Sequence, residues 1–174
     1  MKDRRAGSVA VVVTGVPGSG KTTLGRALAQ ALEAPFLALD AIKERLYESS
    51  GGALLGVDLR LAAERELSAR LSAYEGRVVV DIWIQPGRDT TRVAAWLTAS
   101  ASRVVEVLCR VPAEVAVDRY RRRVRFGPHK PSDEETLQRI RDATAACIPL
   151  GLGPCVEVDT SAPVAMGPLL DRLP

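Results

Sequence analysis

A segment near the amino terminus carries the residues with the clearest chemical role. Residues 15–22 read Gly-Val-Pro-Gly-Ser-Gly-Lys-Thr, which matches the pattern G-x-x-x-x-G-K-[ST] between an apolar run and an amphipathic segment. The three glycines let the backbone curl so that successive N–H groups point inward, as phosphate binding requires. Lys21 can place its charge on the β- and γ-phosphates, and the Thr22 hydroxyl can coordinate Mg²⁺. The segment therefore predicts a binding site for a nucleoside triphosphate.

Asp40 is a candidate for acting on a phosphoryl acceptor. It follows a predicted strand at residues 36–39, and side chains at the carboxyl ends of parallel strands face the ligand crevice. A carboxylate there could accept a proton from, or orient, a hydroxyl that attacks the γ-phosphate. Because Asp40 also precedes a predicted helix, an N-cap role is the alternative, and one side chain can serve both purposes.

Asp81 follows the apolar residues 78–80, as does the acidic residue that holds Mg²⁺ directly or through water in many nucleotide-binding proteins. The apolar run continues at residues 82–84, so Asp81 could instead face the substrate or form a structural ion pair near Arg88. The predicted metal ligands are Thr22 and Asp81. The predicted substrate-binding residues are Asp40, Lys43, Asp81 and Trp83.

Five arginines lie within residues 119–125, ahead of a loop that contains Gly127, Pro128 and the single histidine, His129. On a helix, Arg119 and Arg123 lie one turn apart, and a loop at residues 119–132 could fold over a ligand as a lid. Such arginines could bring guanidinium donors to the transferring phosphoryl group. A solvated helix face is the alternative. We expect His129 to be exposed.

The remaining predictions concern the adenine end of the nucleotide and the full sets of catalytic and nucleotide-binding residues. The turn that contains Thr160 could supply contacts to the adenine base. The predicted catalytic residues are Lys21, Asp40, Arg119 and Arg123. The predicted nucleotide-binding residues are Gly15, Pro17, Gly18, Ser19, Gly20, Lys21, Thr22, Thr23, Arg119 and Thr160.

Strands and helices alternate along the chain, which predicts an α/β/α fold with a mainly parallel sheet covered on both faces. The expected strands are residues 9–14, 36–39, 77–84, 103–111 and 155–159. The expected helices are residues 22–34, 41–48, 59–74, 86–100, 113–125, 132–146 and a short one within 163–174. Ser132 and Glu135 match a capping box at the start of one helix.

Composition limits the class of protein. The 174 residues, 47% of them hydrophobic, predict one domain over residues 1–174 that needs no disulfide, and the three cysteines are expected to be reduced and buried. No apolar run is long enough to span a membrane, so we expect a cytoplasmic protein without a membrane partner. The net charge of +3 and 4% aromatic residues argue against nucleic acid as a partner. Nothing in the sequence indicates the oligomeric state.

The phosphate loop, Asp40, Asp81 and the arginine-rich segment together resemble the small P-loop kinases related to adenylate kinase. The chain looks most like the branch with chloramphenicol phosphotransferase, gluconate kinase and zeta-toxin-type kinases. This resemblance implies a five-stranded parallel sheet, Mg-ATP, Asp40 as the carboxylate that activates the substrate hydroxyl, and Arg119 and Arg123 as lid residues. The run at residues 24–29 is also similar to shikimate kinase, but no Gly-Gly-Gly follows the third strand and no His-Pro follows Asp40 as in gluconate kinase.

These observations predict an ATP-dependent kinase that transfers the γ-phosphoryl group to a hydroxyl of a small molecule, such as a sugar-like metabolite or an antibiotic. An insertion at residues 41–75 is expected to select the acceptor. One alternative is a nucleoside or nucleotide kinase. Another is a toxin-like or regulatory ATP-binding protein that acts on a macromolecular partner.

Overall fold

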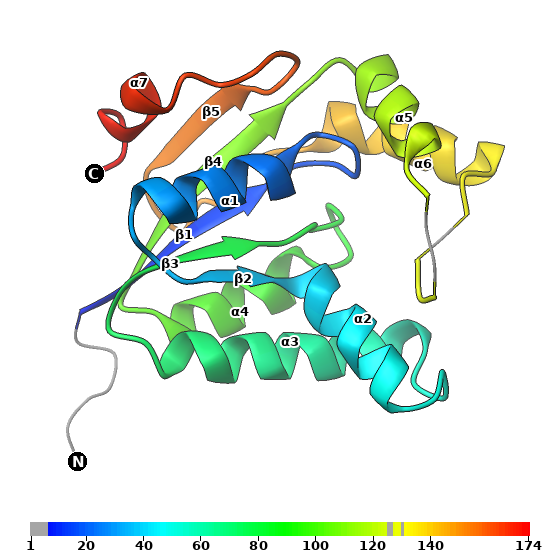
Figure 1. Ribbon diagram of the computed structural model, residues 1–174, viewed down its shortest axis with the longest axis horizontal. Coiled ribbons are helices and arrows are strands. Elements are labelled where there is room, and N and C mark those ends of the chain that lie inside the picture. Colours follow the sequence, from blue (N-terminus) through cyan, green and yellow to red (C-terminus); the bar gives the residue numbers. More distant parts are fainter. Residues whose placement is uncertain (1–6, 125–126, 130) are drawn as a thin grey trace.

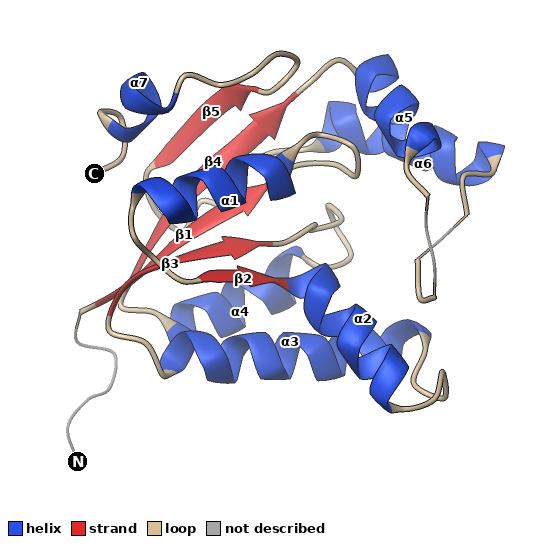
Figure 2. Cartoon of the chain, in the orientation of Figure 1, coloured by secondary structure: helices blue, strands red, loops and turns tan. Residues whose placement is uncertain are grey.

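Five parallel strands form the centre of the computed structural model, in the order β2-β3-β1-β4-β5 (Figure 1). The structure describes residues 7–124, 127–129 and 131–174. The strands are β1 Ser8–Thr14, β2 Phe36–Ala38, β3 Gly76–Asp81, β4 Arg103–Arg110 and β5 Cys155–Asp159. The helices are α1 Lys21–Ala31, α2 Leu39–Ser49, α3 Gly56–Ser72, α4 Thr90–Ser100, α5 Ala113–Arg122, α6 Glu134–Ala146 and α7 Met166–Leu170 (Figure 2).

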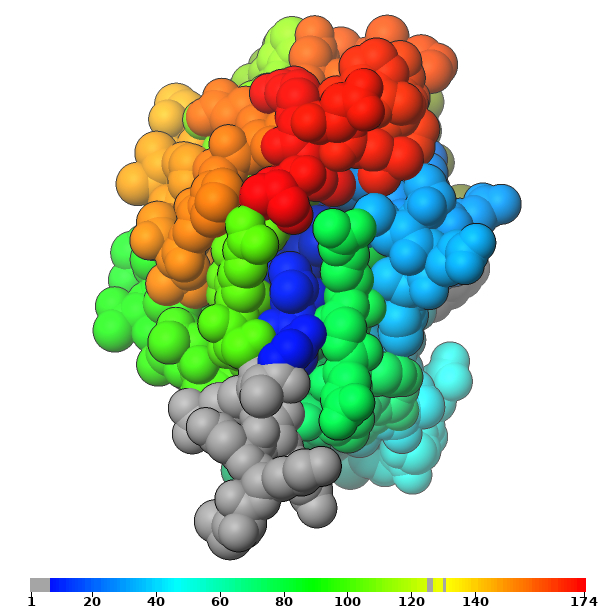
Figure 3. All heavy atoms as spheres, turned by 90° about the vertical axis from the view of Figure 1, so that its left-hand side faces the viewer, coloured from blue at the N-terminus to red at the C-terminus, as the bar shows by residue number. Residues whose placement is uncertain are grey.

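Strand β1 is the central strand of the sheet, because it pairs with β3 along one edge and with β4 along the other (Figure 3), and helices cover both of its faces. Its residues alternate between two hydrophobic clusters, as the twofold period of a strand requires. Ala10 and Val12 pack in the cluster that includes α3 and α4. Val11 and Val13 pack in the cluster that includes α1 and α7. The sequence therefore reads as a continuous apolar run, which is typical of a central parallel strand.

The sheet thus has helices on both faces, with α1 and α7 on one and α3 and α4 on the other (Figure 1). A third apolar cluster joins α5 and α6 to the end of β4, and it includes Leu108, Val117, Tyr120, Leu137 and Ile140. The prediction of a three-layer α/β/α fold with a five-stranded parallel sheet is confirmed. Within the described residues, no helix is both long and apolar enough to cross a membrane.

Several predicted boundaries were wrong in ways that affect the site. Strand β2 ends at Ala38, so Asp40 lies in the first turn of α2 and not at the end of a strand. Strand β3 ends at Asp81 and not at residue 84. Helix α5 ends at Arg122, which places Arg123 in extended backbone after the helix. Arg125, which the predicted helix and lid included, lies outside the described residues.

Two further expectations need correction. The N-cap of α6 is Asp133, whose carboxylate accepts a hydrogen bond of 2.8 Å from the Thr136 N–H, so the capping box at Ser132 and Glu135 was wrong by one residue. The error arose because Asp is as good an N-cap as Ser. Cys109 and Cys147 are buried free thiols as expected, whereas Cys155 is exposed because it begins the edge strand β5.

A fully buried acid on β4 holds the segment that returns the chain to the last strand. The Glu106 side chain is 0% exposed, and its two carboxylate oxygens accept hydrogen bonds from Leu150 N–H at 2.6 Å and Leu152 N–H at 2.8 Å. The segment between α6 and β5 would otherwise leave these two N–H groups without acceptors, at a cost in free energy. Glu106 therefore fixes the path of the chain into β5.

Replacing Glu106 should destabilise the fold without touching the phosphate loop. We expect Glu106→Leu to lower the free energy of unfolding by about 2–4 kcal/mol, because the partly buried N–H groups of Leu150 and Leu152 lose their acceptor. Urea denaturation at 25 °C measures this change. The control is Glu157→Leu on β5, an exposed partner of Arg110, which should cost less than about 1 kcal/mol. Equal losses in the two variants would contradict the role given to Glu106.

Candidate active site

The phosphate loop connects β1 to α1, and its backbone takes a path that only glycine adopts easily. Gly18 has a φ of +86°, and a Cβ atom at this position would lie 2.2 Å from the carbonyl oxygen of Ala116 in α5. Gly20, the N-cap of α1, has a φ of +88°. The Thr160 hydroxyl donates a hydrogen bond of 2.6 Å to the Ser19 carbonyl oxygen. The loop is therefore enclosed by α5 on one side and by the turn after β5 on the other.

Lys21 and Thr22 begin α1 directly after this loop, so they lie at the positive end of the helix dipole. The Lys21 side chain is 8% exposed and lines the cavity described below. Pro17 and Gly18 line the same cavity, whereas Thr23 is exposed on α1. Backbone N–H groups, a helix terminus and a lysine here form a surface suited to an anionic phosphate chain.

Asp81 lies beside Thr22 at the end of β3. The Thr22 hydroxyl donates a hydrogen bond of 2.6 Å to Asp81 Oδ2, and Asp81 is 5% exposed. Burial raises the pKa of Asp81, an effect that Lys21 and the Thr22 hydroxyl oppose in part. The alternative of an ion pair with Arg88 is wrong, because Arg88 pairs with Asp89 at 2.8 Å.

The oxygens of Thr22 and Asp81 fit a magnesium ion that is shared with phosphate. Mg²⁺ prefers oxygen ligands and usually keeps several waters, so one or two protein ligands suffice when phosphates supply others. The part of the chain that the structure describes contains no group of three or more His, Cys, Asp or Glu side chains placed to hold a metal by themselves. A metal at Thr22 and Asp81 would therefore depend on the nucleotide.

Asp40 has an unusually acidic carboxyl group, although its side chain is 52% exposed. Partial desolvation raises its pKa, but the positive charges of Lys43, Lys21 and His129 outweigh this effect and lower the pKa to about 2. Lys43 Nζ also donates a hydrogen bond of 3.2 Å to Asp40 Oδ1. The N-cap of α2 is Ala38, so the N-cap alternative for Asp40 was wrong.

The structure separates the two arginines that were expected on one helix face. Arg119 donates hydrogen bonds of 2.9 Å and 2.8 Å to the carbonyl oxygens of Thr160 and Ser161. It also lies close to the phosphate loop, since its Nη1 is 3.6 Å from where a Cβ of Gly20 would stand. Arg123 instead lines the cavity, and its charge acts on Asp81. The end of α5 at Arg122 causes this divergence.

Arg121 and Arg122, the other described arginines of this run, are exposed to solvent, as the alternative of a solvated helix face predicts. Arg121 pairs with Glu134, and Arg122 pairs with Asp118, in each case between exposed side chains. His129 was expected to be exposed, but its side chain is 14% exposed, because the ring nitrogen Nε2 lies 2.6 Å from Glu44 Oε1 on α2. The tip of the 119–132 segment therefore contacts α2.

A cavity of about 950 Å³ extends from the phosphate loop between α2, α3, α5 and α6. It brings together seven of the predicted residues, namely Pro17, Gly18, Lys21, Asp40, Lys43, Trp83 and Arg123. Arg119 and Thr160 lie on the other side of the phosphate loop, and Thr22 and Asp81 lie below it at the start of α1 and the end of β3. The cavity is large enough for a phosphate group together with a small molecule.

Sequence reasoning missed a charged group on the wall of this cavity. Arg60, Arg88, Asp89 and Arg92 line the cavity, and the buried Glu64 pairs with two of them. A signal was present in the sequence. Glu64, Leu67 and Leu71 follow the spacing of the buried face of α3, so an acid stands where an apolar residue is expected. Buried acids at such positions require cationic partners.

Comparison with known proteins agrees with this fold. A family model described as "AAA domain" matches residues 11–146. No curated protein sequence gives a significant match. A candidate kinase from Chloroflexus aurantiacus J-10-fl superposes with a TM-score of 0.77 and 24% identity over 95% of each chain.

Two further solved structures have the same kinase-like P-loop fold. A gluconokinase from Sinorhizobium meliloti 1021 matches with a TM-score of 0.59 and 24% identity, covering 97% of this chain and 90% of that one. A shikimate kinase from Bacteroides thetaiotaomicron matches with a TM-score of 0.60 and 20% identity, covering 94% and 93%. At these identities the similarity establishes the fold.

The close approach of Gly18 to α5 predicts that the phosphate loop tolerates no side chain there. We expect Gly18→Ala to weaken nucleotide binding by about tenfold or more, because the added Cβ strains the loop against the Ala116 carbonyl. Titration with a fluorescent ATP analogue measures the dissociation constant. Gly76→Ala is the control, because Gly76 has a φ of +85° but open space around it. Equal weakening in both variants would show that a general loss of stability, and not the contact to α5, explains the effect.

Proposed function

The chain belongs to the AAA domain family, and from this premise we propose that it is a kinase that transfers the γ-phosphoryl group of ATP to a hydroxyl group of a small molecule. One observation carries the proposal. Lys21 of the phosphate loop and Asp40 of α2 line the same cavity, which continues past Trp83. A phosphate bound at Lys21 and a hydroxyl bound at Asp40 would therefore share one cavity.

Asp40 would orient the acceptor hydroxyl by accepting its hydrogen bond. A carboxyl group with a pKa of about 2 is fully ionised near neutral pH, but it is a weak base. Phosphoryl transfer through a loose transition state needs little proton abstraction before the bond to the leaving oxygen weakens. The main contribution of Asp40 is thus the alignment of the hydroxyl with the γ-phosphate, and the proton passes to its carboxylate late in the reaction.

The charge that develops on the transferring group would be balanced by Lys21 and Arg123, two cations that line the cavity and act on Asp81. Thr22 and Asp81 would hold Mg²⁺, which when bound neutralises phosphate charge. Arg119 and Thr160 would contact the base end of the nucleotide, since they enclose the phosphate loop from the side of β5.

We assign acceptor binding to residues 41–75, within a single domain over residues 1–174. Lys43 on α2 and Val57, Leu59 and Arg60 on α3 contribute to the cavity wall from this segment. Residues 119–132 are assigned as the lid, because Arg123, Pro128 and His129 line the cavity from the opposite side. Lys130, within this lid, lies outside the described residues.

An acceptor panel tests the proposal directly. Purified protein with Mg-ATP is expected to release ADP in response to one class among sugars, sugar acids, nucleosides and hydroxyl-bearing antibiotics, with Lys21→Ala as the inactive control. A response to nucleosides alone would instead favour a nucleoside kinase. No response to any acceptor, despite ATP binding that Lys21→Ala removes, would contradict the proposal.

Asp40→Asn separates acceptor alignment from nucleotide binding. We expect this variant to bind ATP with unchanged affinity, because the amide occupies the same volume, and to lose transfer by about a hundredfold or more. Initial rates with the acceptor found in the panel, together with an ATP titration, measure the two effects. Normal transfer by Asp40→Asn would exclude the assigned role.

The low pKa of Asp40 predicts how the rate depends on pH. Because the carboxyl stays ionised above its lowered pKa, kcat/KM for the acceptor should show no acid limb due to Asp40 above about pH 4. Lys43→Met removes the nearest positive charge and should raise the pKa toward 3.8, which moves the acid limb upward. His129→Gln identifies any limb due to the imidazole. An Asp40-dependent limb centred above pH 5 in the unmodified protein would contradict the low pKa.

A further inference from the structure

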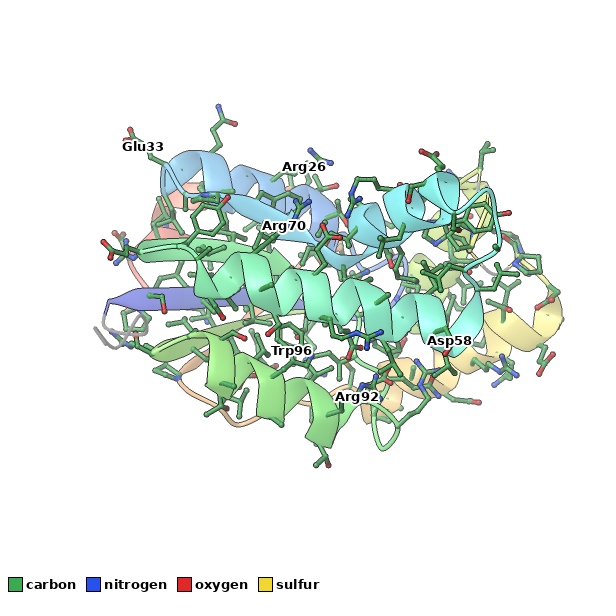
Figure 4. All side chains as sticks on the ribbon, turned by 90° about the horizontal axis from the view of Figure 1, so that it is seen from below. Arg26, Glu33, Asp58, Arg70, Arg92 and Trp96 are labelled. Atoms are coloured by element: carbon green, nitrogen blue, oxygen red, sulfur yellow. The ribbon has the colours of Figure 1, made fainter. Side chains whose placement is uncertain are left out.

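An ion-pair network around two buried carboxylates lies on the cavity wall where α3, α4 and the loop after β3 meet. We call it the Glu64 cluster. Its members are Arg60, Glu64, Arg88, Asp89 and Arg92. The roles proposed above for phosphate, metal and acceptor hydroxyl do not use it. Figure 4 shows the region between α3 and α4, where Arg92 and Trp96 lie.

Glu64 is the centre of the cluster on α3. It is 3% exposed, yet it accepts hydrogen bonds from Arg60 Nε at 2.5 Å and from Arg92 Nε and Nη2 at 2.9 Å and 3.0 Å. The bonds to Arg92 join α3 to α4. A buried carboxylate with several charge-assisted bonds is rigid, because the loss of any partner leaves an unpaired charge away from water.

Asp89 extends the cluster into the loop after β3. It is 1% exposed and lies 2.9 Å from Arg92, 2.8 Å from Arg88 and 3.4 Å from Arg60. Its carboxylate also accepts a hydrogen bond of 3.2 Å from the Gln85 N–H. This last bond closes the turn that precedes α4, so the loop is held at one end by its own N-cap residue.

Arg60 links the Glu64 cluster to the main chain at the acceptor end of the cavity. Its Nη2 donates a hydrogen bond of 3.0 Å to the carbonyl oxygen of Trp83. Trp83 lies two positions after Asp81 in the chain and lines the cavity. Its Nε is occupied by Glu64, and the side chain is 13% exposed. These bonds use Arg60 as a connection between α3 and the main chain at Trp83, and leave its guanidinium poorly placed to act as a free ligand for the acceptor.

We infer that Glu64 and Asp89 are positioning residues that, through Arg60, fix the main chain at Trp83 and so set the shape of the acceptor end of the cavity. The inference rests on the proposed kinase function for its effect on the acceptor. It names specificity-determining residues outside the phosphate site. Direct binding of an anionic acceptor by Arg60 is the competing explanation, and the experiment separates the two.

The first measurement reports on Trp83 itself and needs no acceptor. The chain has two tryptophans, and among the described residues the buried indole N–H of Trp96 has no hydrogen-bond partner. Trp96→Phe therefore loses no polar contact there and leaves Trp83 as the fluorophore. In this background we expect Glu64→Gln to increase acrylamide quenching of Trp83. The control is Glu66→Gln on the same helix, which also loses pairing with two arginines, Arg45 and Arg70, but outside the cavity wall.

The second measurement uses the acceptor found in the panel. We expect Glu64→Gln to raise the KM for the acceptor about tenfold, because a small displacement of the wall misaligns the bound molecule, and to leave the KM for ATP unchanged. Arg60→Lys keeps the positive charge but replaces the two donor nitrogens that bond Glu64 and the Trp83 carbonyl with a single one, so we expect the same rise in the KM for the acceptor. It also serves as the second variant if Glu64→Gln does not fold, as judged by circular dichroism.

The outcomes are distinct. Unchanged Trp83 quenching in folded Glu64→Gln and Arg60→Lys would overturn the inference, whatever the kinetics. If Arg60→Lys weakened only anionic acceptors and left the quenching unchanged, Arg60 would be a direct ligand and the inference would be wrong. If the unmodified protein used no acceptor, the proposed function would fail, and the quenching measurement would still decide whether the cluster fixes Trp83.

Discussion

The curled backbone of the phosphate loop constrains everything packed around it. A glycine at position 18 lets α5 approach until the Ala116 carbonyl occupies the space of a side chain. Thr160, from the turn after β5, closes the loop from the other side through Ser19. Elements far apart in the sequence therefore converge on one short segment. A loop held in this way can present its N–H groups to a phosphate chain without reorganising when the ligand binds.

The two acidic residues beside this loop are shifted in opposite directions, which suits different tasks. Burial raises the pKa of Asp81, which lies under the loop against Thr22. Neighbouring cations hold the pKa of Asp40 well below its ordinary value, because the half-exposed carboxyl faces Lys43, Lys21 and His129. Divergent environments for two carboxylates commonly accompany a division of roles within one site. In the proposed kinase, this division would separate a group on the metal side, Asp81, from a group on the acceptor side, Asp40.

Expectations from local patterns succeeded where the local physics is strong. The phosphate-loop glycines, the alternation of strands with helices and the double burial of β1 follow from backbone stereochemistry and hydrophobic periodicity. Expectations about how side chains meet were less successful. Arg119 and Arg123 were expected together, but α5 ends between them, and carbonyl groups of Thr160 and Ser161 from the far end of the chain capture Arg119.

The sequence by itself determined the fold class, the phosphate loop and the residues able to serve it, because these depend on interactions between residues close in the chain. Only the tertiary structure decided that Lys21, Asp40 and Arg123 share one cavity, and that Glu64 on α3 meets Arg92 on α4. It also brought the charges of Lys21 on α1 and His129 after α5 to Asp40, where they add to the effect of Lys43, a neighbour on the same helix. Such long-range electrostatic contacts depend on packing between distant elements, which no local pattern encodes.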